Sequence, residues 1–251
     1  MTSHIAPLPD HDRSLLLREL NHRVNNELTN AICAISAKAL ESDDVAVKTA
    51  LFDVVELLHC YADVHKSLRM PDPGYLADAA RYLQHLCFSI TKCRLDRLSI
   101  RLLCSADDLR LEGERCWKLG LIVSELLTNV ARHARFDDRD PEAKVKLLLA
   151  GNLVKCAVSD NGSASDLIMS GRGLTIVGEL ASSLGGRVHA SCAAEGSSFL
   201  LAFPLTESEQ HAAGATHVVL KRTKVHRSHK SHVPRAEDAG AGSRATGGGR
   251  T

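Results

Sequence analysis

Residues Leu121 to Ala134 read L-I-V-S-E-L-L-T-N-V-A-R-H-A, and they form the most informative part of a helical pattern over about 114–135. Apolar residues recur at spacings of three and four, which predicts one buried helix face; they are Leu119, Ile122, Val123, Leu126, Leu127 and Val130. The opposite face carries a carboxylate, a carboxamide and two potential cations, namely Glu125, Asn129, Arg132 and His133. Such a stripe suits a hydrated Mg²⁺ ion and phosphate groups, because Mg²⁺ takes oxygen ligands and cations meet phosphate oxygens. An ordinary solvated helix face is the alternative interpretation.

Two short motifs further along the chain are of the kind that completes a nucleotide site. Asp160-Asn161-Gly162 ends a predicted strand, and Gly171-Arg172-Gly173 opens a predicted helix. A carboxylate fixed at a strand end can accept a hydrogen bond from an exocyclic amine, and glycines before a helix let backbone N–H groups approach a phosphate. Each motif alone is weak, because Asp-Asn-Gly is also an ordinary turn and G-x-G is common by chance.

The second half of the chain mixes helical and strand patterns. Gly151-Asn152 joins two alternating segments, which predicts a β-hairpin. Helices are expected near 75–92, 114–135 and 172–184, and strands at Leu98–Cys104, Lys144–Ala150, Leu153–Ser159, Arg187–Ala193 and Ser197–Phe203. Because helices and strands do not strictly alternate, we expect an α+β sandwich with helices on one face of a mixed sheet.

Two helical patterns precede this part, near 13–40 and 45–69, and Glu41-Ser42-Asp43-Asp44 supplies a turn and a helix N-cap between them. They predict a helical hairpin. Neither helix can bury its apolar stripe fully against the other, so we expect a homodimer that completes a four-helix bundle. Met70-Pro71-Asp72-Pro73-Gly74 then breaks the helix and marks a domain boundary.

His22 lies two positions after Leu20 on the first helix, about 200° around it, so it is expected to face water. Its neighbours on that face are all polar: Arg18, Asn25, Asn26 and Thr29. Another protein could reach a ring nitrogen of His22 only if the imidazole is exposed in this way. A lone surface histidine, however, usually has no function.

In this order and spacing the motifs resemble the sensor histidine kinases of two-component systems over residues 14–204, about three quarters of the chain. E-L-N-H-R-V-N-N-E-L (Glu19–Leu28) is similar to the phosphoacceptor box of the H-R-x-x-N-N subclass, which is related to the HWE kinases. Leu121–Ala134 resembles the N box of the ATP-binding domain, V-S-D-N-G its G1 box, G-R-G-L-T-I-V its G2 box and G-S-S-F-L-L-A-F-P-L its closing strand. The resemblance implies a dimerising helical hairpin followed by an α+β sandwich of the Bergerat or GHKL ATPase type.

The resemblance also implies a role for each motif residue. His22 would be the phosphorylated nucleophile, and Glu19 would orient its ring or accept its other N–H; a surface carboxylate without a role is the alternative for Glu19. Asn129 would bind Mg²⁺, Glu125 would be the N-box acid near the metal and its waters, and Asp160 would read adenine. The other residues implied in ATP binding are Arg132, His133, Gly162, Gly171, Gly173 and Ser197. ATP and Mg²⁺ are the implied cofactors.

We therefore expect an ATP-dependent histidine kinase that autophosphorylates His22 and passes the phosphoryl group to an aspartate of a response-regulator receiver domain. Two departures from the family pattern favour an alternative: Ala164 replaces the second glycine of D-x-G-x-G, and only Ser163–Ser170 separate Gly162 from Gly171. The alternative is a histidine phosphotransfer or docking protein with a degenerate ATP site. A serine/threonine kinase of the related anti-sigma type would not need the histidine box.

Composition argues against several other classes of protein. The 251 residues have a net charge of +1, which gives no global reason to expect a nucleic-acid partner. No apolar run is long enough to cross a bilayer, and the N-terminus lacks the pattern of a signal peptide. We therefore expect no membrane partner and a cytoplasmic location. The eight scattered cysteines are interpreted as small buried hydrophobic residues.

The expected domain organisation has four parts: a disordered N-terminus at 1–12, the dimerising phosphotransfer hairpin at 13–72, the ATP-binding domain at 75–205 and a disordered basic tail at 206–251. The tail is rich in Gly, Ala, Ser, His and basic residues and has few large apolar side chains. Because nothing before the hairpin is long enough to fold, we expect no sensor domain in this chain. Input would come from a partner such as a separate sensor protein, or from the expression level.

Overall fold

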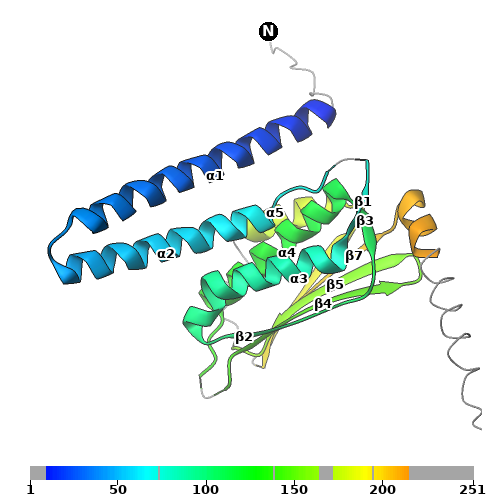
Figure 1. The fold of residues 1–251 in the computed structure, drawn as a ribbon. Coiled ribbons are helices and arrows are strands. Elements are labelled where there is room, and N and C mark those ends of the chain that lie inside the picture. The colour runs from blue at the N-terminus through cyan, green and yellow to red at the C-terminus, as the bar shows by residue number, and fades with distance from the viewer. Residues whose placement is uncertain (1–9, 73, 138, 164–171, 194, 215–251) are drawn as a thin grey trace, which may run out of the picture. The chain divides into compact units, whose positions relative to one another are not determined.

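The computed structural model describes residues 10–72, 74–137, 139–163, 172–193 and 195–214 (Figure 1). Its first two helices, α1 (Asp10–Glu41) and α2 (Val45–Ser67), pack against each other as a hairpin. The Asp44 carboxylate caps α2, because it accepts hydrogen bonds from the backbone N–H groups of Ala46 and Val47 at 2.8 and 3.3 Å. The expected helical hairpin is confirmed.

The hairpin leaves part of its apolar surface uncovered by this chain. Ile32 and Ala39 of α1 are buried, whereas Leu20 is 58% exposed. On α2, Phe52 and Val54 are also exposed. Large apolar side chains exposed along both helices are typical of a surface that packs against a further helix.

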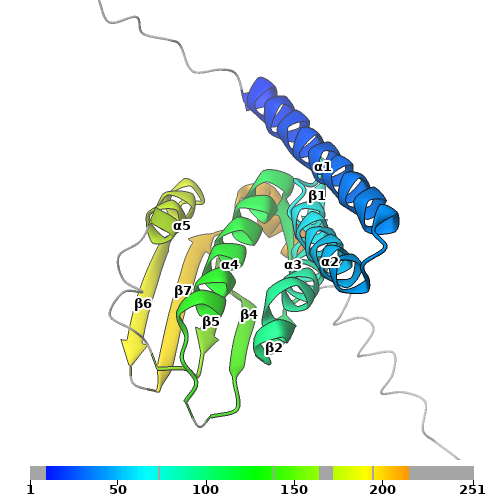
Figure 2. The same cartoon turned by 90° about the vertical axis from the view of Figure 1, so that its left-hand side faces the viewer.

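The second part of the chain is built on a five-stranded sheet in the order β2-β4-β5-β7-β6. The strands are β2 (Arg101–Ala106), β4 (Glu142–Ala150), β5 (Leu153–Asp160), β6 (Arg187–Ala193) and β7 (Gly196–Pro204). Only the β2–β4 pair is parallel, and the other neighbours are antiparallel. The helices α3 (Ala79–Ile90), α4 (Gly113–His133) and α5 (Arg172–Ser183) lie along one face of this sheet (Figure 2). The expected α+β sandwich with a mixed sheet is confirmed.

The core lies between this helical layer and the sheet. All six apolar residues predicted for the inner face of α4 are buried. Alternate residues of the central strands face them, among them Val154, Cys156 and Val158 of β5. Because side chains alternate along a strand, Asp160 at the end of β5 points to the same side as these residues. The helix-facing side of the sheet therefore carries both the core and the candidate site.

The structure differs from the sequence prediction at the start of the sheet domain. Residues expected to begin a helix instead form β1 (Leu76–Asp78), which pairs antiparallel with β3 (Arg110–Glu112). The helix begins only at Ala79, because the Asp78 side chain caps it by accepting from Arg81 N at 2.9 Å. After it come a π-helix η1 (Thr91–Leu95) and a 3₁₀ turn η2 (Asp96–Leu98). The turn includes Leu98, the first residue of a predicted strand, and that strand, β2, begins only at Arg101.

The predicted start of the disordered tail, residue 206, is too early in the sequence. Residues 207–214 are helical, and Glu209 is fully buried. Composition alone missed this segment, because its order depends on a contact with Arg115, far away in the sequence. At the other end, α1 begins at Asp10, three residues before the expected boundary. Residues 1–9 and 215–251 lie outside the described part of the chain. Within the described part, no helix is long and apolar enough to cross a membrane.

Candidate active site

The predicted polar stripe of α4 meets the start of α5. A Cβ atom placed on Gly173 would lie 3.1 Å from Glu125 Oε2 and 4.0 Å from Asn129 Oδ1. Glu125 and Asn129 are half-buried, so they do not belong to an ordinary solvated helix face. The structure therefore brings together two side-chain oxygens of the N-box stripe and one glycine of the G-x-G motif.

Asp160 is held in a tight turn at the end of β5. Its Oδ1 accepts a hydrogen bond from Gly162 N at 2.9 Å, and no partner of Oδ2 is seen among the described residues. Gly162 is buried, and a Cβ atom there would lie 3.0 Å from the carbonyl oxygen of Arg135, just beyond α4. Ser163 N donates to the same carbonyl at 2.6 Å. Gly162 thus joins the Asp160 turn to the end of α4, a packing role that the sequence did not reveal.

Ser197 lies beside Asp160 on the neighbouring strand. Ser159 pairs with Ser198 in the β5–β7 register, so the next step along both strands places Ser197 next to Asp160. The Ser197 side chain is buried. Gly196 precedes it with φ of 148°, and a Cβ atom there would come within 2.1 Å of the Asp160 carbonyl oxygen, so only glycine fits this approach.

Cys192 is a neighbour of this site that the sequence interpretation missed. It pairs with Ser197 across β6 and β7 and is exposed. Partial burial, and then the nearby carboxylate of Asp160, raise the pKa of the Cys192 thiol above its usual value. Only the pairing of Cys192 with Ser197 places this cysteine near the site, and that pairing is known only once the strand register is known.

Arg132 and His133 at the end of α4 are placed differently from each other. Arg132 lines a cavity of about 200 Å³ with Glu125, Thr128 and the α2 residue His65. His133 is half-buried, and among the described residues no hydrogen bond or ion pair joins it to Asp160 or Glu125. The predicted site residue Gly171 and the lid residues 164–170, including Ala164, lie outside the described residues.

His22 is exposed on α1, as the helical spacing predicted. Its Nδ1 lies 3.2 Å from Asn26 Nδ2, one helical turn further along. Glu19 does not fill its expected role of ring partner, because its Oε1 accepts from Arg23 Nε at 2.9 Å. The side chain that contacts the imidazole in the structure is Asn26.

The chain does not bring His22 and Glu125 together. His22 lines a groove of about 320 Å³ between α1 and α2, in which Asp63 and Lys66 belong to α2. Glu125 lines the cavity of about 200 Å³ described above, which His65 of α2 also lines. The C-terminal part of α2 therefore lies between His22 and the N-box stripe.

The residues that meet where α4 approaches the start of α5 fit Mg²⁺ and a nucleotide. Glu125 and Asn129 of α4 offer oxygen ligands, which Mg²⁺ prefers, and the lack of a side chain at Gly173 lets the start of α5 approach these oxygens closely. The described residues hold no group of three or more His, Cys, Asp or Glu side chains that could bind a metal ion without help.

Two family models match the chain. One described as "Histidine kinase" matches residues 19–94, and one described as "Histidine kinase-like ATPase domain" matches residues 91–196. The first includes His22 and most of the hairpin, and the second includes the α4 stripe and Asp160. The chain belongs to the histidine kinases.

A curated relative is similar to the chain in sequence, and a solved structure is similar to it in fold. The chain is 25% identical over 210 residues to blue-light-activated histidine kinase 2 of Erythrobacter litoralis (strain HTCC2594), and this alignment covers 77% of the chain and 58% of the relative. The chain thus spans somewhat more than half of that relative's length. The solved histidine kinase domain of the EL346 blue-light-activated histidine kinase from Erythrobacter litoralis aligns with a TM-score of 0.52 and 20% identity, covering 74% of this chain and 98% of that domain. The alignment confirms the expected fold.

Proposed function

We propose that this histidine kinase uses ATP and Mg²⁺ to phosphorylate its own His22 and then passes the phosphoryl group to an aspartate of a response-regulator receiver domain. The supporting observation is that Glu125, Asn129 and Gly173 converge at the start of α5 in a chain that also exposes His22 on a polar helix face. A degenerate ATP site has no physical need for such a convergence.

The ATP-binding residues act by position and charge. Bound Mg²⁺ would neutralise phosphate charge, with Asn129 Oδ1 as a ligand and Glu125 beside the metal and its waters. The second oxygen of Asp160 would accept a hydrogen bond from the adenine amine. Backbone N–H groups at the start of α5, around Gly173, would meet the phosphates. Phosphoryl transfer requires little more of the protein than such positioning.

Asn26 determines which ring nitrogen of His22 reacts. Because Nδ1 faces the Asn26 carboxamide, Nε2 is the nitrogen that takes the phosphoryl group. The Asn26 oxygen can accept the Nδ1 proton, since amide oxygen and nitrogen are assigned from their partners, and Nε2 then carries the lone pair. The Nε2–P bond forms as the bond from the γ-phosphorus to the leaving ADP oxygen breaks. The Nδ1 proton is then released to water.

We further propose that the chain acts as a homodimer. The exposed apolar residues Leu20, Phe52 and Val54 of the hairpin support it, because a second hairpin packed in a four-helix bundle would cover such residues. A second subunit would also offer a further N-box site to His22.

The alternative is a histidine phosphotransfer or docking protein that takes phosphate from a separate kinase. The substitution at Ala164 and the short segment Ser163–Ser170 favour it. In that case His22 would be phosphorylated only when another kinase is added.

The two functions are separated by incubating the purified chain with Mg²⁺ and γ-labelled ATP. We expect acid-labile label on the parent protein, and none on His22→Ala or Asn129→Ala. Circular dichroism controls for the folding of both variants. Absence of both label and nucleotide binding in the parent would overturn the kinase assignment and favour the phosphotransfer protein.

A further inference from the structure

We propose that the groove between α1 and α2 binds the phosphoryl group once it is on His22, and that Arg18 holds its oxygens. This inference rests on the proposed function in one respect, namely that His22 is the phosphorylated residue. It adds a site that binds the phosphoryl group of phosphorylated His22. The residues of this site lie outside the ATP-binding domain.

The groove is predominantly cationic. Arg18 lines it from α1, and Lys66 and Arg69 line it from α2. The other groups in its lining that can carry charge are Asp63 and the imidazole of His22 itself. Three cations therefore face one carboxylate, and the excess positive charge favours a dianionic phosphoryl group over the bare imidazole.

Arg18 has donors that nothing in the described chain satisfies. Its Nε and one terminal nitrogen, Nη2, are buried and have no hydrogen-bond partner among the described residues. Buried donors without partners are unfavourable, and a guanidinium presents neighbouring N–H groups in the geometry that suits two phosphate oxygens. A phosphoryl group in the groove would supply the missing acceptors.

The helix places Arg18 within reach of that phosphoryl group. Arg18 precedes His22 by one turn, so the two side chains are neighbours on the helix surface, and both line the groove. Arg23, the residue after His22, is engaged by Glu19 at 2.9 Å. Because Asn26 contacts Nδ1, the phosphoryl group would be attached to Nε2, the other nitrogen of the ring.

The test uses phosphoramidate, a small anionic donor that phosphorylates imidazole and releases ammonia, so it needs no ATP site. The full chain, Arg18→Ala, Arg18→Lys and Lys66→Ala are treated with it, and ³¹P NMR then follows the phosphohistidine signal against pH. His22→Ala serves as the blank. Lys38→Ala is the matched control, because Lys38 lies on the same helix and pairs with Glu41 instead of lining the groove.

In Arg18→Ala we expect the pKa of the phosphoryl group to rise by about 0.5 to 1, because a nearby cation favours the dianion. Arg18→Lys should restore part of the difference, Lys66→Ala should show a smaller rise, and Lys38→Ala should match the parent. Identical titrations of the parent and of both Arg18 variants would overturn the proposal. So would the absence of phosphohistidine on the parent, since an anion-binding groove must admit this donor. A chain that phosphoramidate labels but ATP does not would contradict the proposed kinase function and leave this inference standing.

Discussion

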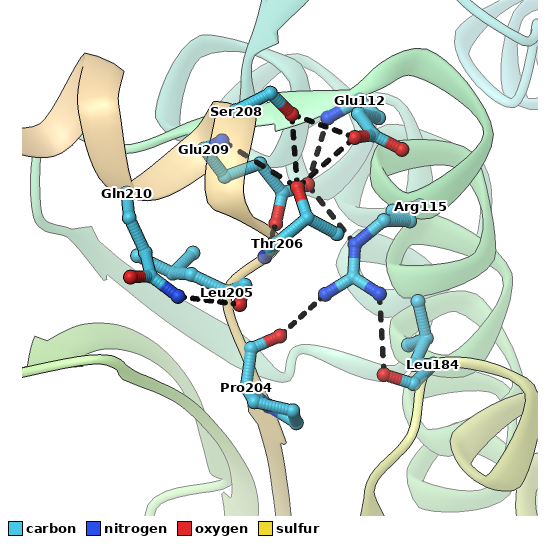
Figure 3. Close-up of polar contacts among 9 residues, drawn as sticks. All are labelled: Glu112, Arg115, Leu184, Pro204, Leu205, Thr206, Ser208, Glu209 and Gln210. Atoms are coloured by element: carbon cyan, nitrogen blue, oxygen red, sulfur yellow. Dashed lines mark hydrogen bonds and ion pairs between the residues drawn. The ribbon is translucent and has the colours of Figure 1, made fainter.

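The buried carboxylate of Glu209 accepts a hydrogen bond from Arg115 Nε at 3.0 Å, across 94 residues of sequence (Figure 3). Glu209 also accepts from the backbone N–H groups of Glu112 and Thr206, each at 2.9 Å. Glu112 is the N-cap residue of α4, so the negative charge of Glu209 lies at the positive end of the helix that carries Glu125. The segment beyond the last strand therefore stabilises the helix of the candidate site.

Replacing Glu209 by Ala should lower the free energy of unfolding by about 3–5 kcal/mol, because the mostly buried guanidinium of Arg115 loses its charged partner. Urea denaturation of the full chain measures the effect. Glu207→Ala in the same short helix is the control, since Glu207 is exposed and should change stability by no more than about 0.5 kcal/mol. Equal denaturation midpoints for the two variants would contradict the structural role of Glu209.

Gly173→Ala tests the approach of α5 to the N-box stripe. The new methyl group would lie 3.1 Å from Glu125 Oε2, and a side chain of this flexibility can move aside, so the fold should persist. We expect ATP binding to weaken by about tenfold, which corresponds to about 1.4 kcal/mol. Isothermal titration with ATP and Mg²⁺ measures it.

Gly178→Ala is the matched control for this experiment. Gly178 lies in the same helix, and a Cβ atom there meets nothing within 4 Å. Alanine should stabilise the helix by up to about 1 kcal/mol and leave ATP affinity unchanged. The Gly173 interpretation fails if both variants bind ATP equally well.

Asn26→Ala tests the orientation of the phosphoacceptor. Loss of the contact with His22 Nδ1 should slow autophosphorylation by about two- to tenfold, the range for one hydrogen bond of about 0.5–1.5 kcal/mol. ¹⁵N NMR of His22 should also show a changed balance between the two ring tautomers, which a purely structural role would not cause. Asn30→Ala, one exposed turn further along α1, should change neither. An unchanged rate and tautomer balance in Asn26→Ala would rule out the positioning role.

Local patterns in the sequence were sufficient to predict the elements that contain strong periodicity. The inner face of α4 was predicted residue by residue, and all six residues are buried. Asp160 and Gly173 were found from short motifs, because a turn and a helix start leave local signals. The family resemblance then related these motifs to one ATP site before any distance was known.

The features that the sequence did not reveal depend on contacts between distant segments. Nothing near Glu209 indicates that Arg115 will pair with it, so composition predicted disorder there. The short strand β1 is stabilised by pairing with β3, and three residues carry too little periodicity to predict it. Glu19 was expected near the imidazole, but Arg23 lies equally close on the helix and offers it a full charge.

Cys192 provides a chemical probe of Asp160. Because burial and the Asp160 carboxylate raise the pKa of this thiol, less of the reactive thiolate is present at neutral pH, and alkylation by iodoacetamide should become fast only at higher pH. Asp160→Asn removes the negative charge, so the pKa should fall and alkylation at pH 8 should accelerate by about two- to fivefold, with burial retaining the rest of the shift. Mass spectrometry gives the rate at Cys192, and the exposed Cys33 serves as a reference in the same sample. Glu195→Gln, an exposed charge change close in sequence, should leave the profile unaltered. If Asp160→Asn also leaves it unaltered, the Asp160 carboxylate is not a cause of the raised pKa of the Cys192 thiol.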